Sequence, residues 1–89
     1  MAQVVWTREA LSDVAAIRSY IGQFNPEAAA RFAERLIEAG DSLAEFPAKG
    51  RSIGHGFRQW SLIRPYLIRY LVDGHYVYII DIVHGAQNA

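Results

Sequence analysis

The sequence YLIRYLVDGHYVYIIDIVH, residues 66–84, consists of two β-prone runs joined by Asp73-Gly74. Asp-Gly between alternating apolar residues is a strong signal for a two-residue hairpin turn. The stretch therefore predicts two antiparallel strands, and the position of the turn sets which residues lie opposite one another. The predicted cross-strand pairs are Tyr70 with Val77, Ile68 with Ile79 and Arg69 with Tyr78.

The alternation along these strands places apolar side chains on both faces of the hairpin. One face carries Tyr66, Ile68, Tyr70, Val72, Val77, Ile79, Asp81 and Val83. The second face carries Leu67, Arg69, Leu71, Tyr76, Tyr78, Ile80, Ile82 and His84. Because an antiparallel sheet at the surface usually presents one polar face to water, a hairpin that is apolar on both faces needs cover on both.

The first half of the chain predicts a short strand and two helices. Val4–Trp6 is a β-prone run, and Thr7 after it is a suitable N-cap for a helix from Arg8 to Gly22. Asn25-Pro26 starts a second helix, because asparagine is a good N-cap and proline fits the first helical position. We expect this helix to continue to Phe46 and to pack antiparallel against the first, since their connection is short.

Residues 47–56, PAKGRSIGHG, contain three glycines and a proline and are predicted to form a mobile loop. The alternating run FRQWSL, residues 57–62, then predicts a third strand that forms an antiparallel meander with the hairpin. The element order strand, helix, helix, strand, strand, strand predicts one α+β domain over residues 1–89. In it, the N-terminal strand and the helical hairpin pack on one face of an antiparallel sheet.

Two helices can cover only one face of such a sheet. We assign them to the face that carries Ile68, Tyr70, Val77 and Ile79, which leaves no element for the second face. Burying four aliphatic side chains of the second face is worth on the order of 6 to 12 kcal/mol before ordering costs. Since apolar patches of this size mark interaction sites, we predict that the second face binds another polypeptide. The alternatives are that the C-terminal tail folds back over it, or that the helices straddle the sheet.

Composition and charge narrow the class of protein. The 89 residues include no cysteine, and nine basic residues balance nine acidic ones. With three dispersed histidines as the other ligands to consider, we expect no metal site and no cofactor. No run approaches the roughly 18 apolar residues of a membrane span, so we expect a soluble, cytoplasmic protein. Between Lys49 and Arg69 there are five basic residues and no acidic one, a weak indication of nucleic-acid binding.

Several fragments, taken in their order and spacing, resemble the RelE/ParE toxin family of bacterial type II toxin-antitoxin modules. They are TREALSD (7–13), NPEAA (25–29), FPAKGR (46–51), PYLIRY (65–70) and VYIIDIVHGAQ (77–87). The resemblance covers nearly the whole chain, and the closing HGAQ is most similar to the ParE branch. It implies a RelE/ParE-like β-α-α-β-β-β fold.

The resemblance also implies a growth-inhibiting toxin that is silenced by a co-expressed, ParD-like antitoxin. Such antitoxins combine a DNA-binding head with an amphipathic C-terminal segment, form a heterotetramer with the toxin and bind operator DNA themselves. An amphipathic segment fits the uncovered second face predicted above. The residues predicted to bind it are Leu67, Arg69, Leu71, Tyr76, Tyr78, Ile80 and Ile82.

The family contains two kinds of toxin, which differ in chemistry. RelE-like toxins cut messenger RNA on the ribosome, whereas ParE-like toxins act on DNA gyrase. Metal-free RNA cleavage needs a general base, a general acid and cations that hold the phosphate. The candidates for these roles are Arg51, Arg69, Tyr78 and His84. Each also has a structural interpretation: a solvated loop arginine, a cation–π pair between Arg69 and Tyr78, a groove-lining ring and a strand-terminal histidine.

Two features favour the gyrase-directed branch. The chain has no net charge, whereas a protein that binds RNA through its phosphates is usually basic. Position 86 is Ala where the family pattern has Arg, which removes a cation beside His84. We therefore expect a toxin without enzymatic activity that binds and poisons gyrase, with Lys49, Arg51, His84 and Gln87 as candidate target contacts. The alternatives are a ribosome-dependent mRNA endonuclease and a detoxified co-regulator that only binds the antitoxin.

Overall fold

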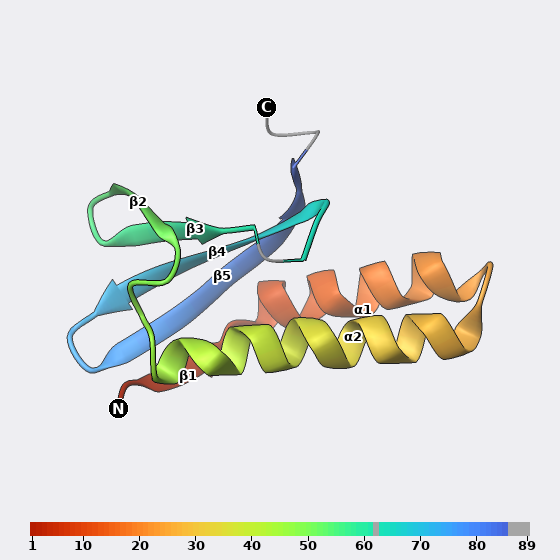
Figure 1. Cartoon of the computed structure of the whole chain (residues 1–89), viewed down its shortest axis with the longest axis horizontal. Coiled ribbons are helices and arrows are strands. Elements are labelled where there is room, and N and C mark those ends of the chain that lie inside the picture. The colour runs from red at the N-terminus through yellow and green to blue at the C-terminus, as the bar shows by residue number, and fades with distance from the viewer. Residues whose placement is uncertain (62, 86–89) are drawn as a thin grey trace.

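The computed structural model describes residues 1–61 and 63–85. Two helices, a 3₁₀ turn and five strands follow one another in this part of the chain (Figure 1). In chain order they are β1 (Gln3–Trp6), α1 (Arg8–Gly22), α2 (Pro26–Asp41), η1 (Ser42–Ala44), β2 (Arg51–Gly54), β3 (Phe57–Trp60), β4 (Tyr66–Asp73) and β5 (Tyr76–His84). The predicted α+β class, with a helical hairpin on one face of a sheet, is confirmed.

Local capping signals define where the helices begin. The Thr7 side chain accepts a hydrogen bond from the Ala10 N–H at 3.2 Å, and the Asn25 side chain accepts one from the Ala28 N–H at 3.1 Å. Each bond satisfies a backbone donor that has no partner within the helix. α1 has the predicted bounds, whereas α2 ends at Asp41 and the chain continues as η1 rather than as an α-helix to Phe46.

The strands form one mixed sheet in the order β1-β5-β4-β3-β2. β1 is parallel to β5, with Val4 opposite Val77 and Trp6 opposite Ile79, and the other neighbours are antiparallel. We predicted that the N-terminal strand packs with the helices on one face of an antiparallel sheet, but β1 is itself an edge strand of the sheet and makes it mixed. Parallel pairing needs only a long connection, which the chain between β1 and β5 provides. Both helices lie on one side of this sheet, and the turn that joins them lies beyond its edge (Figure 1).

The segment 47–56 contains strand β2, where we predicted only a loop. β2 pairs with β3, so that Arg51 lies opposite Gln59 and Gly54 lies opposite Phe57. Between them, His55-Gly56 has φ angles of 56° and 86°, as a tight two-residue hairpin turn requires. The glycines that indicated a loop therefore belong to a hairpin at the outer edge of the sheet. The strand predicted over 57–62 ends at Trp60, and Leu62 lies outside the described residues.

The hairpin between β4 and β5 turns at Gly74-His75, because Asp73 itself pairs with Tyr76. The predicted register, with its turn at Asp73-Gly74, was therefore wrong. The observed pairs are Tyr70 with Ile79, Ile68 with Ile82 and Arg69 with Asp81.

The assignment of the hairpin's helix-facing side chains is nevertheless confirmed near the turn. Ile68, Tyr70, Val77 and Ile79 are all 2% exposed or less. The observed turn shifts the predicted partners by two positions, and a shift by an even number keeps each side chain on its face.

A β-bulge changes this pattern further along β5. Between the Tyr70–Ile79 pair and the Arg69–Asp81 pair, β5 has one extra residue, Ile80. An extra residue reverses the alternation of the side chains that follow it. The faces predicted beyond this point were therefore wrong, because strict alternation in the sequence gives no sign of a bulge. Ile82 and His84 lie on the helix side, and Asp81 and Val83 lie on the opposite side.

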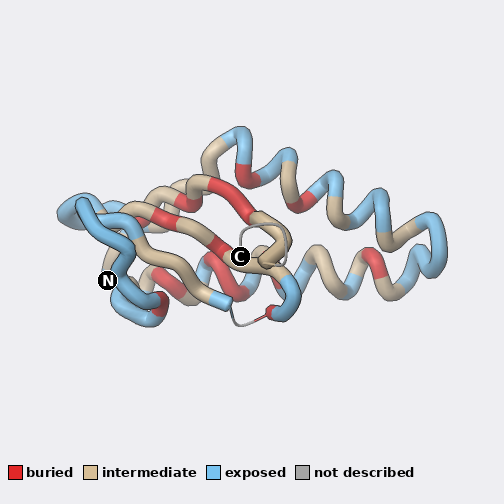
Figure 2. The backbone as a smooth tube through the Cα atoms, turned by 90° about the horizontal axis from the view of Figure 1, so that it is seen from above, coloured by how far each residue is buried: buried red, intermediate tan, exposed pale blue. Residues whose placement is uncertain are grey.

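The hydrophobic core lies between the helices and the sheet. Figure 2 shows the buried positions mainly along the central strands and the helix turns next to them. At one end of this core, the Trp6 indole fills the space that a Cβ on Gly40 would occupy. The Trp6 Nε1–H also donates to Asp41 Oδ1 at 3.0 Å, so that β1 is fixed to α2 as well as to β5. The buried residues that form this core cluster are Ala10, Val14, Leu36, Ala39, Leu43, Ile63, Ile68, Tyr70, Val77, Ile79 and Ile82.

We expect Gly40→Ala to lower the free energy of unfolding by about 1 to 3 kcal/mol, because the added methyl group overlaps the Trp6 ring. Urea denaturation followed by tryptophan fluorescence measures the change. Gly22→Ala is the matched control, since its new Cβ would meet the Ala29 Cβ at 3.7 Å, an ordinary contact. We expect the control to change the free energy of unfolding by no more than about 0.5 kcal/mol. Equal losses in the two variants would contradict this account of the Trp6–Gly40 contact.

Candidate functional site

The face of the sheet opposite the helices, which we call the open face, is covered by no described element (Figure 1). Its side chains form rows across the strands, because residues that pair in register lie on the same face. An apolar row consists of Val5, Tyr78, Leu71 and Phe57. A polar row consists of Asp81, Arg69, Gln59 and Arg51, and beyond it lies a pair of aliphatic residues, Val83 and Leu67. The open face is therefore apolar on both sides of a charged stripe.

Aromatic rings extend the apolar surface toward the β4–β5 turn. The rings of Tyr76 and Tyr78 stack with their centroids 6.0 Å apart and an angle of 28° between their planes. Tyr76 is 43% exposed and Phe57 is 37% exposed, although both are large apolar side chains. Partly exposed aromatic residues of this kind are enriched at protein interfaces. This end of the open face thus has the composition of a docking surface.

The charged stripe is centred on an ion pair between Arg69 and Asp81. Arg69 Nε donates to Asp81 Oδ1 at 2.7 Å, and Nη2 donates to Oδ2 at 2.6 Å. This bidentate geometry is the strong form of an arginine–carboxylate interaction. The Asp81 side chain is only 13% exposed, against 37% for Arg69. The bulge at Ile80 makes the pair possible, because it places Asp81 opposite Arg69.

The electrostatic surroundings of Arg69 are acidic. Its hydrogen bond to Asp81 is the main reason why the pKa of Arg69 is raised above its ordinary value. Burial acts in the opposite direction, whereas the charges of Asp81, Glu9 and Asp13 raise the pKa further. One guanidinium thus lies within the field of three carboxylates. A phosphate that approached Arg69 would compete with Asp81 for the guanidinium and would be repelled by the charges of Asp81, Glu9 and Asp13.

The four candidates for RNA cleavage do not converge on one point. Arg69 and Tyr78 lie on the open face, and Arg51 lies on the same face but two strands away from Arg69, on the edge strand β2. His84 lies on the helix side instead, with its ring centroid 5.5 Å from that of Tyr66. The prediction that His84 shares a face with Arg69 and Tyr78 was wrong, because the bulge at Ile80 reverses the alternation before His84 is reached.

The same bulge corrects the predicted antitoxin-binding set. Ile82 is 5% exposed and belongs to the core, so its place on the binding face was wrong. Ile80 is the bulge residue and is half-buried. The members of the set that lie on the open face are Leu67, Arg69, Leu71, Tyr76 and Tyr78.

Three apolar residues of the open face were missed in the sequence: Val5, Phe57 and Val83. Val5 and Phe57 lie on four-residue strands, which are too short to show which face a residue occupies. Val83 follows the bulge and was assigned to the other face. The pairing of Val5 with Tyr78 and of Phe57 with Leu71 identifies the first two.

Basic side chains lie at the β2 edge of the sheet. Lys49 and Arg51, two of the candidate target contacts, are exposed on either side of Gly50. Lys49 Nζ is 4.8 Å from the centroid of the Trp60 ring. Arg58 differs from both, because its Nη1 donates to the Gly50 carbonyl oxygen at 2.7 Å. Of the other candidate contacts, His84 is described above, and Gln87, like Ala86, lies outside the described residues.

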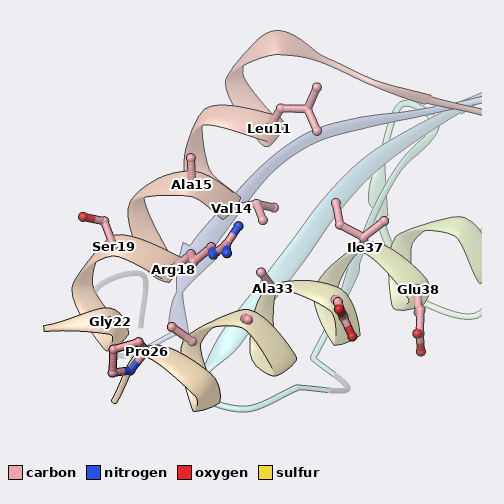
Figure 3. A pocket seen from close by; sticks show the side chains of 13 residues that line it. Leu11, Val14, Ala15, Arg18, Ser19, Gly22, Pro26, Ala33, Ile37 and Glu38 are labelled. Atoms are coloured by element: carbon pink, nitrogen blue, oxygen red, sulfur yellow. The ribbon is translucent and has the colours of Figure 1, made fainter. Parts of the chain in front are cut away.

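A groove of about 820 Å³ lies between α1 and α2 (Figure 3). None of the predicted site residues lines it. Its apolar lining includes Leu11, Val14, Ala15, Ala29, Ala30, Ala33 and Ile37, and its charged lining consists of Arg18, Glu34 and Glu38.

The described ranges 1–61 and 63–85 contain no group of three or more His, Cys, Asp or Glu side chains placed to hold a metal ion. Within the same ranges, neither helix combines the length and hydropathy that a membrane span requires.

Comparison with known proteins gives a family match over most of the sequence. The family model described as the ParE toxin of type II toxin-antitoxin system, parDE, matches residues 4–89. Toxin RelE2 of Caulobacter vibrioides is 53% identical over 87 residues, which cover 98% of this chain and 99% of that protein. Toxin RelE1 of the same organism is 41% identical over 67 residues, which cover 72% of each chain.

A solved structure supports the same assignment. A chain of the chromosomal ParDE TA system from P. aeruginosa has a TM-score of 0.84 and 28% sequence identity to this chain. The match covers 94% of this chain and 96% of that one. The resemblance inferred from the sequence fragments is therefore confirmed. Because the family model, the relatives and the solved structure agree, the chain belongs to the ParE toxin family of type II toxin-antitoxin systems.

Proposed function

We propose that this toxin of a type II toxin-antitoxin system stops growth by binding and poisoning DNA gyrase. The similarity of its closing sequence to the ParE branch points to gyrase as the target. The alternative mode of action, RNA cleavage on the ribosome, needs catalytic groups that meet around one phosphate.

The observation that carries the proposal is the separation of these groups. Arg69 is held by Asp81 through two hydrogen bonds, and His84 lies on the face opposite Tyr78. A general base must come within about 3 Å of the hydroxyl proton that it removes, or act through one water. A histidine on one face of a sheet and a tyrosine on the other cannot both do so for a single RNA phosphate. This arrangement supports action by binding over action by cleavage.

The antitoxin is proposed to cover the open face. Its two apolar areas, one with Leu71 and Tyr78 and one with Leu67 and Val83, suit the apolar side of an amphipathic segment. The Arg69–Asp81 pair between them offers a polar group to that segment. We propose further that two toxins and two antitoxins form a heterotetramer, in which the antitoxin alone contacts operator DNA.

With purified gyrase and a relaxed plasmid, we expect the toxin to reduce supercoiling and to make cleaved DNA accumulate. Agarose gels with and without detergent and protease treatment measure both effects. Addition of the antitoxin in equimolar amount is the control, and it should restore supercoiling.

Two outcomes would contradict the proposal. One is site-specific breakage of translated messages while gyrase activity is unchanged, which would identify a ribosome-dependent endonuclease. The other is normal colony formation when the toxin is expressed without its antitoxin, which would identify a detoxified co-regulator.

We expect His84→Gln to change growth inhibition by less than about tenfold, because the structure places His84 beside Tyr66 and away from Arg69. If His84 were a general base, its removal would lower the rate of cleavage by about 100- to 10,000-fold. The inducer dose that halves the growth rate measures the effect. His75→Gln at the exposed β4–β5 turn is the matched control. A loss of killing by His84→Gln in the range of a general base, with His75→Gln unchanged, would favour the nuclease instead.

We expect Leu71→Asp to weaken antitoxin binding by at least about 100-fold, because an unpaired carboxylate would be buried in the apolar row of the open face. Titration calorimetry with the purified antitoxin measures the affinity. Leu11→Asp makes the same chemical change in the groove between the helices, and we expect it to leave the affinity within about threefold of the parent. The reverse result, with binding lost in Leu11→Asp and kept in Leu71→Asp, would place the antitoxin on the helices.

A further inference from the structure

The segment Phe46–Arg51, which we call the anchored segment, is on the surface but is fixed from below by a buried phenol. Tyr70 is 0% exposed, and its hydroxyl donates to the Pro47 carbonyl oxygen at 2.7 Å. The same hydroxyl accepts a hydrogen bond from the Gly50 N–H at 2.8 Å. A single side chain from the centre of the sheet thus ties together both ends of the Pro47–Gly50 turn.

The protonation state of Tyr70 is consistent with this role. Burial raises the pKa of Tyr70 above its ordinary value, although the Gly50 N–H and Arg58 act in the opposite direction. The phenol is therefore protonated at neutral pH, and it has a proton to donate to Pro47.

A second anchor comes from β3. Arg58 Nη1 donates to the Gly50 carbonyl oxygen at 2.7 Å and reaches the Ala48 carbonyl oxygen at 3.4 Å. Hydrogen bonds from a charged donor are stronger than those between neutral groups. One of the basic residues of this region thus fixes the backbone of its neighbours.

Gly50 has no room for a side chain. A Cβ at this position would lie 2.8 Å from the Gln59 carbonyl oxygen and 2.9 Å from the Tyr70 hydroxyl. The backbone of the anchored segment is therefore pressed against β3 and β4, and its path has little freedom.

The charged side chains that the anchored segment turns outward are both basic. Lys49 and Arg51 flank Gly50, and Lys49 Nζ lies over the rings of Trp60 and Phe46 at 4.8 Å and 5.3 Å. These cation–π contacts direct the ammonium group without neutralising it. Glu38 and Arg35 of α2 line the same small cavity as Lys49, so their opposite charges offset each other. No acidic residue occurs in the sequence from position 46 to position 72.

We propose that the anchored segment is the element with which the toxin contacts an acidic protein surface of its target, and that Tyr70 and Arg58 are the residues that position it. This inference rests on the proposal that the toxin acts by binding. A backbone that is ordered before binding loses less conformational entropy in the complex, so two cations on a fixed support bind more tightly than two on a flexible loop. The target surface is expected to be acidic because charge complementarity speeds encounter and selects the partner.

Two sets of variants, assayed by the inducer dose that halves the growth rate, test the proposal. Lys49→Ala/Arg51→Ala removes the exposed charges, and we expect it to need at least about tenfold more toxin for the same inhibition. Lys49→Arg/Arg51→Lys keeps the charges and should retain full activity. Arg8→Ala/Arg31→Ala removes two exposed charges from the helices and serves as the matched control. All variants should unfold in urea at a midpoint close to that of the parent, as followed by tryptophan fluorescence, which shows that they are folded.

The positioning role of Tyr70 has its own readout. We expect Tyr70→Phe to weaken inhibition like the loss of the two cations, and to add no further loss when combined with Lys49→Ala/Arg51→Ala. This lack of additivity distinguishes an effect through the anchored segment from general destabilisation, which would add. Tyr66→Phe, on the same strand, is the control for loss of a phenol hydroxyl. If Tyr70→Phe does not fold, as judged by its unfolding in urea, Arg58→Met takes its place.

Full activity of Lys49→Ala/Arg51→Ala would overturn the contact, and full activity of folded Tyr70→Phe and Arg58→Met would overturn the positioning. Tight binding of the toxin to plasmid DNA alone, lost in Lys49→Ala/Arg51→Ala, would show that the acidic partner is nucleic acid and would also overturn the proposal. These results are distinguishable from a failure of the gyrase proposal. A toxin that leaves gyrase unaffected but loses killing in Lys49→Ala/Arg51→Ala refutes the target and supports the anchored segment as the contact.

Discussion

The one-residue bulge at Ile80 determines what each face of the sheet presents. Hydrogen bonds from α1 and its N-cap residue, Thr7, hold this bulge of β5 in place. The Thr7 hydroxyl donates to the Ile79 carbonyl oxygen at 2.6 Å and lies 3.1 Å from that of Ile80, and Asp13 Oδ2 accepts a hydrogen bond from the Ile82 N–H at 2.9 Å. The Ile79 carbonyl oxygen also accepts the Thr7 N–H at 3.3 Å, and the bonds at Ile80 and Ile82 satisfy backbone groups that lie beyond the end of β1. Thr7 therefore both caps α1 and fixes β5 at its bulge. The start of the helix and the distortion of the strand depend on each other.

The predictions from the sequence were accurate where they rested on neighbouring residues and wrong where they depended on contacts between distant segments. Thr7 and Asn25-Pro26 located both helix starts, because a cap depends on residues within one turn of the chain. The helix-facing residues near the hairpin turn were also correct, because strand alternation is local. The parallel pairing of β1, the true turn at Gly74-His75 and the strand within 47–56 depend on contacts between distant segments. Local pattern contains little information about such contacts.

The candidate site shows the same division more sharply. The open face was predicted from a count of helices against sheet faces, and most of its central residues, such as Leu67, Leu71 and Tyr78, were correct. Ile82, Asp81 and His84 were assigned to the wrong faces by a single inserted position, since every side chain after a bulge changes side. The ion pair between Arg69 and Asp81 was not predictable either, because the bulge alone brings the two residues together. A one-residue error in strand alternation therefore first affects predictions of chemistry that requires particular side chains to share a face.

The Arg69–Asp81 pair has a consequence for the free protein. A bare apolar sheet is a natural place for two identical molecules to stick together. A second copy laid on this face would have to strip water from two such pairs at once, and the desolvation of ions is repaid only when the partner offers well-placed polar groups. A dedicated partner protein can carry such polar groups, whereas a second copy of the same chain does not provide them. The ion pair at the centre of the open face thus favours binding of a specific partner over self-association.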